Sequence, residues 1–223
     1  MAERPGLVIF DCDGVLVDSE PITNRILSER LTRYGRPTSE KDCAERWVGG
    51  TVAGIFREAR AQGARLPDDW VARTYDIYFE TLGREVEPIP GIEAVLDRLD
   101  AAGIPYCVAS NGPVRKIEVT LGRCGLTERF GDRVYSAHVV GSTKPEPGLF
   151  LHAAAALGVR PADCAVIGDS PNDVVAAWAA AMRCLGYCRE TPAARLSALG
   201  AETFDDMVAL PALLGLMAGS AAE

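Results

Sequence analysis

The sequence has 223 residues, of which 31 are acidic and 23 are basic, and its net charge is −8. Such a charge argues against non-specific binding to nucleic acid or to membrane surfaces, and no apolar run approaches the length of a membrane span. The length fits one domain with an insertion, or two small domains.

Two features favour a cytoplasmic protein. The stretch Met1–Gly6 lacks the charged and apolar regions of a secretory signal. The seven cysteines are odd in number and scattered, which is typical of free thiols in a reducing compartment. We therefore expect a cytoplasmic protein, and a monomer by default.

The first predicted element is a short strand that ends in two carboxylates. The apolar run Leu7–Phe10 is bounded by a turn signal, which predicts a strand buried on both faces. Because side chains alternate along a strand, Asp11 and Asp13 should point to one side and Cys12 to the other. Ligands of open α/β sheets bind beyond the carboxyl ends of the strands, so chemistry is expected here. A plain Asp-Gly turn beginning at Asp13 is the structural alternative.

The next part of the chain is predicted to be helical. Apolar residues at helical spacing indicate helices over residues 22–34, 52–62 and 68–82, each followed by a glycine. No convincing strand lies among them, whereas a crossover between parallel strands usually needs only one helix. We therefore expect residues 18–85 to form an inserted helical cap, and residues 1–17 and 86–223 to form the core domain.

From residue 86 onward, strand and helix patterns alternate, which predicts an α/β fold with a parallel sheet and helices on both faces. The remaining strands are expected at residues 104–109, 133–136, 164–167 and 183–187, and the helices at residues 92–99, 114–121, 150–157, 174–178 and 206–217.

An anion-binding turn is indicated after residues 104–109. There, Ser110 offers a hydroxyl, and Asn111 and Gly112 offer backbone N–H groups at the start of a helix. Pro113 at the first helical position supports that helix start. A plain capping turn is the structural alternative.

Further charged groups follow the later strands. Lys144 is one of only three lysines in the chain, and it could neutralise both a phosphate and a carboxylate. Asp169 and Asp173 follow residues 164–167, where acids are commonly helix caps. If Asp169 joins Asp11 and Asp13 at one sheet edge, a divalent cation is needed, and oxygen ligands favour Mg²⁺.

Four motifs, each at a strand end, together resemble those of the haloacid dehalogenase-like hydrolase superfamily over nearly the whole chain. The motifs are Asp11-Cys12-Asp13-Gly14-Val15-Leu16-Val17-Asp18-Ser19-Glu20, Ser110-Asn111-Gly112, Lys144-Pro145-Glu146-Pro147 and Gly168-Asp169-Ser170-Pro171-Asn172-Asp173. The sequence is most similar to the branch that holds small-metabolite phosphatases and β-phosphoglucomutase. The resemblance implies a Rossmann-like core and a helical cap inserted after the first strand.

The resemblance also implies catalytic roles. Asp11 would be the nucleophile that forms an aspartyl-phosphate intermediate. Asp13 would protonate the leaving oxygen and then activate water. Ser110, the Asn111 amide and Lys144 would hold the phosphoryl oxygens, and Lys144 would also offset the repulsion between two anions.

The same resemblance implies a magnesium site and a substrate class. Mg²⁺ would be held by Asp11, the Asp13 backbone carbonyl and Asp169, with Asp173 in support. The substrate would be a small phosphorylated metabolite such as a sugar, sugar-acid or polyol phosphate. The cap would select its leaving group, and Glu20 and the loop Gly49–Thr51 are the candidates to face the cleft.

Two other functions remain open at this point. A β-phosphoglucomutase-like phosphoryl transferase is disfavoured because residues 48–54 lack the basic side chains that would bind a second phosphate. A catalytically silent binding or signalling protein on the same fold is disfavoured by the complete set of acids together with Ser110 and Lys144.

Overall fold

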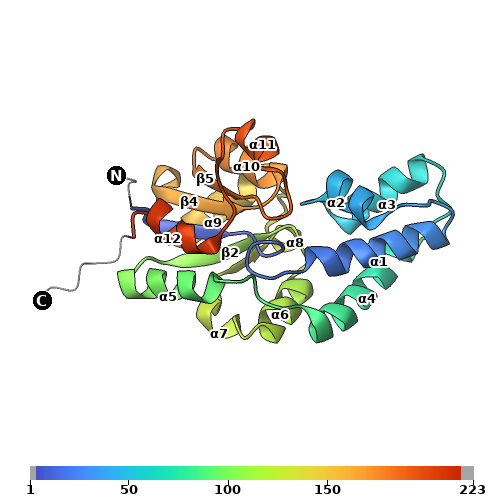
Figure 1. Cartoon of the computed structure of the whole chain (residues 1–223), viewed down its shortest axis with the longest axis horizontal. Coiled ribbons are helices and arrows are strands. Elements are labelled where there is room, and N and C mark those ends of the chain that lie inside the picture. The colour runs from blue at the N-terminus through green and yellow to red at the C-terminus, as the bar shows by residue number, and fades with distance from the viewer. Residues whose placement is uncertain (1–3, 217–223) are drawn as a thin grey trace, which may run out of the picture.

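The structure, a computed structural model, describes residues 4–216. The first three residues of the stretch searched for a secretory signal, and Met217 of the expected C-terminal helix, lie outside this range. Within it, six strands form one sheet in the order β3-β2-β1-β4-β5-β6, and every neighbouring pair is parallel (Figure 1). The predicted α/β fold with a parallel sheet is confirmed.

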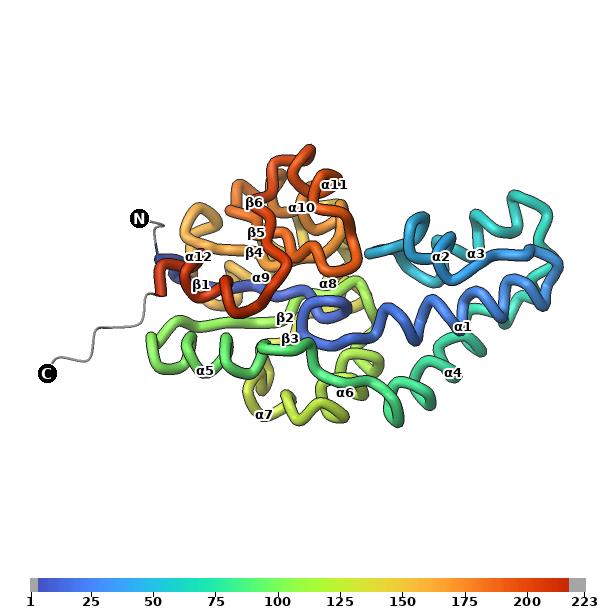
Figure 2. The backbone as a smooth tube through the Cα atoms, viewed as in Figure 1, coloured from blue at the N-terminus to red at the C-terminus, as the bar shows by residue number. Residues whose placement is uncertain are grey.

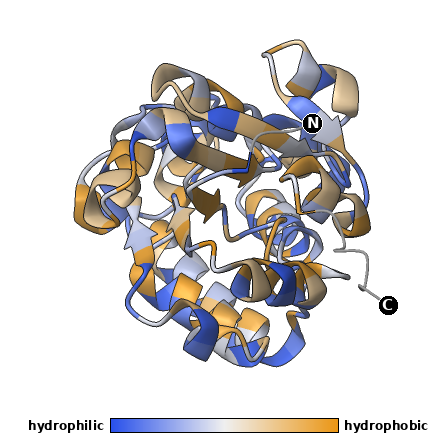
Figure 3. Ribbon diagram, turned by 90° about the vertical axis from the view of Figure 1, so that its left-hand side faces the viewer, coloured by the Kyte–Doolittle hydropathy of each residue, from blue (hydrophilic) through white to orange (hydrophobic). Residues whose placement is uncertain are grey.

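The strands are short apolar runs buried in the middle of the molecule. They are β1 (Leu7–Phe10), β2 (Tyr106–Ser110), β3 (Val134–Ser136), β4 (Cys164–Gly168), β5 (Arg183–Tyr187) and β6 (Glu202–Phe204). Every residue of β1, β2 and β4 is buried, and these central strands carry mostly hydrophobic colours in Figure 3. Because all strands run in parallel, their carboxyl ends lie on one edge of the sheet.

Helices cover both faces of the sheet. Apolar side chains of α5, α6, α7 and α12 pack on one face, and those of α8, α9, α10 and α11 pack on the other. These helices are α5 (Ile92–Ala102), α6 (Val114–Arg123), α7 (Thr127–Phe130), α8 (Ala137–Val140), α9 (Gly148–Ala156), α10 (Pro171–Ala179), α11 (Ala193–Ser197) and α12 (Leu210–Leu213), with 3-10 turns η1 (Pro161–Asp163) and η2 (Met207–Ala209). The sheet is therefore buried on both sides, as its apolar strands require.

Four helices between β1 and α5 lie at one end of the molecule, at the right in Figures 1 and 2. They are α1 (Glu20–Arg33), α2 (Glu40–Trp47), α3 (Val52–Ala61) and α4 (Trp70–Glu85). Their apolar faces form a continuous hydrophobic cluster with the α5–α6 side of the sheet, and α4 packs against α6. The division into a cap of residues 18–85 and a core of residues 1–17 and 86–223 stays a prediction.

Several helices were not predicted, namely α2 and the four- or five-residue helices α7, α8 and α11. Helix α2 was not predicted because its only fully buried side chain is Cys43, which leaves little periodicity; its signal is the capping box between Ser39 and Asp42. Residues 206–217 were expected to be helical, with a break or restart at Pro211, and the described part is helical only in short pieces. That stretch contains η2 and the four-residue α12, with Pro211 in the first turn of α12, where a missing N–H is tolerated.

The remaining expectations about the chain are mostly met. Strand β6 was missed because it has three residues and only one is buried. All seven cysteines are free thiols, and all but Cys188 are buried. In the described part of the chain, none of the helices combines the length and the apolar character needed to cross a bilayer.

Candidate active site

A pocket lies where the carboxyl edge of the sheet faces α1, α3 and α4. Asp11, Ser110 and Asp169 come from three adjacent strands, β1, β2 and β4, and all three line the pocket. Glu20 and Tyr78 line it from the helical side. The pocket encloses about 70 Å³ of space, which suits a small ligand.

Asp11 directly follows the central strand. The residue is 5% exposed, and its Oδ1 accepts hydrogen bonds from the Cys12 backbone N–H at 2.7 Å and from Lys144 Nζ at 2.9 Å. Burial raises the pKa of Asp11 to about 7; Lys144 opposes this shift, and neighbouring carboxylates add to it. The Cys12 side chain points the other way, into the core, as strand alternation predicted.

Lys144 connects three groups behind the pocket. Its Nζ lies 2.9 Å from Asp11 Oδ1 and 2.6 Å from Asp173 Oδ1, and it donates to the Ala109 carbonyl at 3.2 Å. The residue is 3% exposed. Burial alone would lower the pKa of Lys144, but its two carboxylate partners outweigh burial and raise it. Lys144 is therefore a fixed positive charge beside Asp11.

Three carboxylates converge beside this lysine. Single carboxylate oxygens of Asp11, Asp169 and Asp173 lie within 4.8 Å of one another, and all three residues are buried. Burial first, and then the other two carboxylates, raise the pKa of Asp169 well above its usual value. A Cβ at Gly14 would lie 2.8 Å from the Asp169 Cγ, so only glycine admits that carboxylate. This all-oxygen donor set fits Mg²⁺.

Asp173 is held from two sides. One oxygen binds Lys144, and the other accepts from the Ser170 backbone N–H at 3.1 Å and from the Ser170 hydroxyl at 2.5 Å. Ser170 and Asp173 thus form the capping box of α10. One carboxylate oxygen of Asp173 therefore serves the helix cap, while the other contacts Lys144.

Ser110 is the last residue of β2, and Asn111 follows it. Ser110 is 1% exposed, and its hydroxyl accepts from the Gly112 backbone N–H at 3.0 Å. The Asn111 side chain accepts from the Lys144 backbone N–H at 2.9 Å and donates to the Lys144 carbonyl at 3.0 Å. Asn111 therefore fixes the loop that carries Lys144. Helix α6 begins at Val114, one residue later than expected, with Pro113 as its N-cap.

Asp13 belongs to a separate charge cluster. Its Oδ1 lies 2.6 Å from Lys116 Nζ and accepts from the Ser19 hydroxyl at 2.6 Å. Burial would raise the pKa of Asp13, but Lys116 outweighs burial and lowers it. Glu20 lines the same side of the pocket; burial and the Asp13 carboxylate raise the pKa of Glu20 to about 7. The pKa values of Asp11 and Asp13 thus move in opposite directions, because burial dominates at Asp11 whereas the pairing with Lys116 dominates at Asp13.

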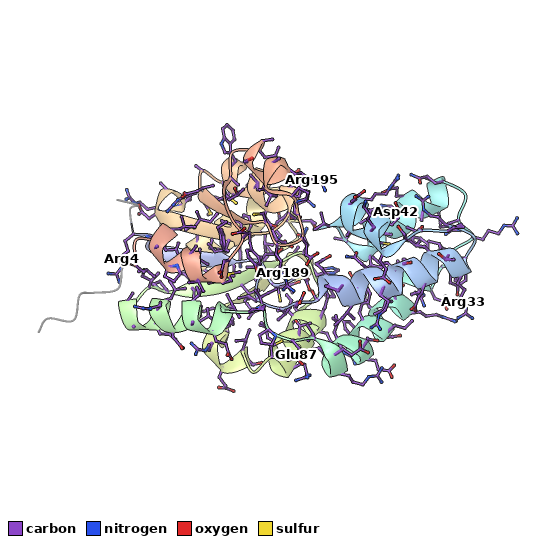
Figure 4. All side chains as sticks on the ribbon, viewed as in Figure 1. Arg4, Arg33, Asp42, Glu87, Arg189 and Arg195 are labelled. Carbon is purple, nitrogen blue, oxygen red and sulfur yellow. The ribbon has the colours of Figure 1, made fainter. Side chains whose placement is uncertain are left out.

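The loop between α2 and α3 closes one side of the pocket. The Gly49 carbonyl accepts from Asn111 Nδ2 at 3.1 Å and from Asn172 Nδ2 at 3.0 Å. A second backbone contact joins Arg195 to the Glu45 carbonyl at 3.1 Å. In Figure 4, Arg195 lies on the side of the α10–α11 region that faces α2. The loop is therefore held through the Gly49 carbonyl, and helix α2 is held through the Glu45 carbonyl.

The predicted site residues lie together in the structure. Asp11, Asp13, Ser110, Asn111 and Asp169 line the pocket. Lys144 and Asp173 contact Asp11 or its neighbours from behind. Their roles stay predictions. Sequence reasoning gave no role to Lys116 or Asn172; the signal for Lys116 is its place in the first turn of the helix that follows β2.

Comparisons with known proteins point to one family. A family model described as haloacid dehalogenase-like hydrolase matches residues 5–181. A 6-phosphogluconate phosphatase from Escherichia coli K12 is 28% identical over 92% of this chain and 93% of its own. A phosphoglycolate phosphatase from Psychrobacter arcticus is 29% identical over 81% of this chain and 82% of its own.

Solved structures agree with these relatives. A haloacid dehalogenase-like protein of unknown function from Agrobacterium tumefaciens is 34% identical, with a TM-score of 0.82 over 95% of this chain and 98% of its own. A haloacid dehalogenase family hydrolase from Deinococcus radiodurans R1, solved with bound phosphate and sodium, is 30% identical. Its TM-score is 0.78 over 96% of this chain and 97% of its own.

Proposed function

This chain belongs to the haloacid dehalogenase-like hydrolase family and is a phosphoric monoester hydrolase, and we propose that it cleaves small phosphorylated metabolites by transferring the phosphoryl group to Asp11. The observation that carries the proposal is the placement of Asp11. Its Oδ1 is held by Lys144 and by a backbone N–H, so Oδ2 is the oxygen left to attack phosphorus.

The first step breaks the ester bond. Asp11 Oδ2 attacks phosphorus, the bond to the leaving oxygen breaks, and that oxygen takes a proton from Asp13. Lys144 supplies positive charge beside Asp11, which reduces the repulsion between the carboxylate and the phosphate. The Ser110 hydroxyl and the Asn111 backbone N–H, at the end of β2, would donate to the phosphoryl oxygens.

The second step restores the free protein. Asp13 accepts a proton from a water molecule, which attacks the phosphorus of the aspartyl phosphate. The bond from phosphorus to Asp11 breaks, and inorganic phosphate leaves. Both steps require Asp13 to exchange protons with the substrate side of the pocket, which it lines together with Lys116 and Glu20.

The donor set at the sheet edge supports a magnesium cofactor. Asp11, Asp169 and the Asp13 backbone carbonyl would hold Mg²⁺, with Asp173 in support. When bound, the ion would neutralise the charge of the phosphoryl group as it is transferred. The relatives named for 6-phosphogluconate and phosphoglycolate support a small acidic or sugar-derived ester as substrate.

The proposal is tested by measuring phosphate release from a panel of sugar, sugar-acid and polyol phosphates, with Mg²⁺ and with a chelator. We expect release that requires Mg²⁺ and that falls by about a thousandfold or more in Asp11→Asn, because the nucleophile is lost. The matched control is Asp76→Asn, which alters an exposed residue of α4 and should leave release unchanged.

Two results would contradict the proposal. One is undiminished release by folded Asp11→Asn, and the other is release that persists in chelator. Transfer of the phosphoryl group between two positions of a sugar bisphosphate, in place of release to water, would instead identify the phosphoryl transferase left open by the sequence.

A further inference from the structure

Two lysines are buried at this site, and they occupy different positions. Lys144 lies behind Asp11 and is surrounded by the Asp11 and Asp173 carboxylates and a backbone carbonyl. Lys116 projects from the first turn of α6, is 8% exposed, and lines the pocket itself. The second lysine is therefore placed to meet the substrate directly.

Lys116 is the only basic side chain that lines the pocket within residues 4–216. The other charged side chains there are carboxylates, among them Asp13 and Glu20. A buried ammonium group is costly to retain unless it is paired or used. The pairing with Asp13 satisfies part of this need, since Asp13 Oδ1 lies 2.6 Å from Lys116 Nζ.

This single pairing leaves donor capacity on Lys116. An ammonium group has three protons to donate, and Asp13 Oδ1 is already shared with the Ser19 hydroxyl. The Nζ atom also lies 5.8 Å from the centre of the Tyr78 ring, which faces it from α4. Lys116 thus lies between the sheet edge and the helical side, at the wall of the pocket that these two sides enclose.

The two lysines divide the pocket into two ends. If the phosphoryl group lies at Asp11 and Ser110, the rest of the substrate must extend past Asp13 toward Lys116 and the helical side. Among the described residues, that end of the pocket has Lys116 as its one cation, with the carboxylates of Asp13 and Glu20 beside it, which favours a singly charged group there over a doubly charged second phosphate.

We propose that Lys116 is a specificity-determining residue that binds a carboxylate on the leaving-group part of the substrate, so that the protein prefers phosphate esters of hydroxy acids. This inference rests on the proposed function and concerns the same pocket. On substrate binding, the incoming carboxylate shares the Lys116 ammonium with Asp13. A hydroxyl at the same place on an alcohol-derived ester gains only a neutral hydrogen bond.

The test compares two esters that differ only at the far end, 6-phosphogluconate and sorbitol 6-phosphate. We measure kcat/KM for both with the wild type and with Lys116→Gln, Lys116→Arg and Lys41→Gln. The wild type should prefer the acid, and Lys116→Gln should reduce the ratio of acid to alcohol by about 10- to 100-fold. Lys116→Arg keeps the charge and should retain most of the ratio.

Lys41→Gln is the matched control, because Lys41 is an exposed lysine of α2 outside the pocket, and it should leave the ratio unchanged. Glu20→Gln provides a test of opposite sign. Glu20→Gln removes a carboxylate that lines the same pocket as Lys116, so the ratio of kcat/KM for the acid to kcat/KM for the alcohol should rise. The ratio is measured within each variant and therefore does not depend on how much active protein is recovered.

The outcomes separate this inference from the proposed function. An equal loss on both esters in Lys116→Gln would mean that Lys116 acts only through Asp13, and it would overturn the inference while leaving the phosphatase intact. Equal kcat/KM for both esters in the wild type would overturn it as well. No release from any ester by the folded wild type, in contrast, would remove the proposed function itself.

A second measurement needs no variant and remains decisive if Lys116→Gln does not fold. Gluconate and sorbitol are compared as inhibitors of wild-type phosphate release from a third ester. Gluconate should inhibit at concentrations about tenfold or more below those of sorbitol, because only gluconate carries a carboxylate. Equal inhibition by the two compounds would overturn the proposal.

Discussion

The two sides of the pocket are built differently. On the sheet edge, polar side chains are buried and hold one another: Lys144 has three partners, and Asp173 has one partner for each carboxylate oxygen. On the helical side, the loop beside Gly49 is held by two amide side chains through one carbonyl. The chemistry is thus assigned to fixed groups, and the selection of substrate to a segment with fewer constraints.

A physical reason connects this difference to function. Groups that stabilise charge during phosphoryl transfer are most effective when they are already in place, since no energy is then used to reorient them. A segment that must admit substrate and then exclude water has to move. Breaking the hydrogen-bonded sheet edge should therefore strongly affect both stability and chemistry, whereas loosening the helical side should affect mainly chemistry.

The largest expected effect comes from Lys144→Met. Removing this cation leaves the Asp11, Asp169 and Asp173 carboxylates buried without a positive partner, so we expect about 3–5 kcal/mol of destabilisation in chelator. Mg²⁺ should restore part of that loss, and phosphate release should be nearly abolished. Denaturant unfolding with and without Mg²⁺ measures the loss of stability in chelator and its partial recovery in Mg²⁺. Lys41→Met, a change at an exposed lysine, is the control.

Equal stability of Lys144→Met and wild type in chelator would mean that Lys144 does not stabilise the buried carboxylates that it contacts, and it would contradict this description of the sheet edge. A destabilised variant that does not respond to Mg²⁺ would contradict the assignment of the three carboxylates as a cation site.

The next effect is a pH dependence of stabilisation by Mg²⁺. The pKa of Asp11 is raised from 3.8 to about 7 in the metal-free folded protein. The unfolded chain therefore ionises first, and the contribution of Asp11 to stability is lost as the pH rises through this interval. Mg²⁺ removes the penalty, so its stabilising effect should grow between about pH 4 and pH 7.

Thermal unfolding at several pH values, in Mg²⁺ and in chelator, checks this dependence. The two melting curves should be close near the acid end of the interval and should separate toward neutral pH. Asp11→Asn should flatten the dependence. A difference in melting temperature between Mg²⁺ and chelator that stays constant from about pH 4 to pH 7 would contradict the raised pKa of Asp11 in the metal-free protein.

Smaller effects are expected on the helical side. Gly49 has a φ of +70°, and a Cβ there would lie 2.7 Å from Ser170 Cβ, so Gly49→Ala should prevent the loop from seating. We expect kcat/KM to fall by about tenfold, with a loss of stability near 1 kcal/mol. Asn172→Ala removes one donor to the Gly49 carbonyl and should cost about two- to fivefold in kcat/KM.

Gly63→Ala is the matched control for backbone strain. Gly63 also has a positive φ, of +91°, but nothing lies within 4 Å of its Cβ position. The Gly63→Ala variant should lose about as much stability as Gly49→Ala, but it should keep the kcat/KM of the wild type. If Gly49→Ala and Gly63→Ala behave alike, the contact between the loop and the sheet edge has no part in catalysis.

The sequence predicted the sheet edge better than the helical side. Asp11, Ser110 and Asp169 each follow a buried apolar run, and a parallel sheet brings such ends together whatever their separation in the chain. The alternation of side chains was enough to direct Cys12 into the core. These features depend on local patterns, which a single sequence contains.

The missed features depend on contacts between distant segments. Lys116 meets Asp13 because α6 packs beside the turn after β1, and nothing near either residue indicates that pairing. Asn172 binds a carbonyl of a loop more than a hundred positions away, and a carbonyl carries no sequence signal. On the helical side, residue patterns thus indicated Glu20 and the loop Gly49–Thr51, which line the pocket, but not the long-range contacts that hold this side together.

The central claim is that Asp11 receives the phosphoryl group. It is tested most directly with Asp13→Asn and 4-nitrophenyl phosphate, whose leaving group needs no proton from Asp13, so that only the second step should be slow and the aspartyl phosphate should accumulate. The protein is mixed with Mg²⁺ and this ester, quenched, reduced with borohydride and analysed by peptide mass spectrometry. We predict homoserine at position 11, absent when Asp11 is also changed to Asn; a reduced residue at any other aspartate would contradict the account.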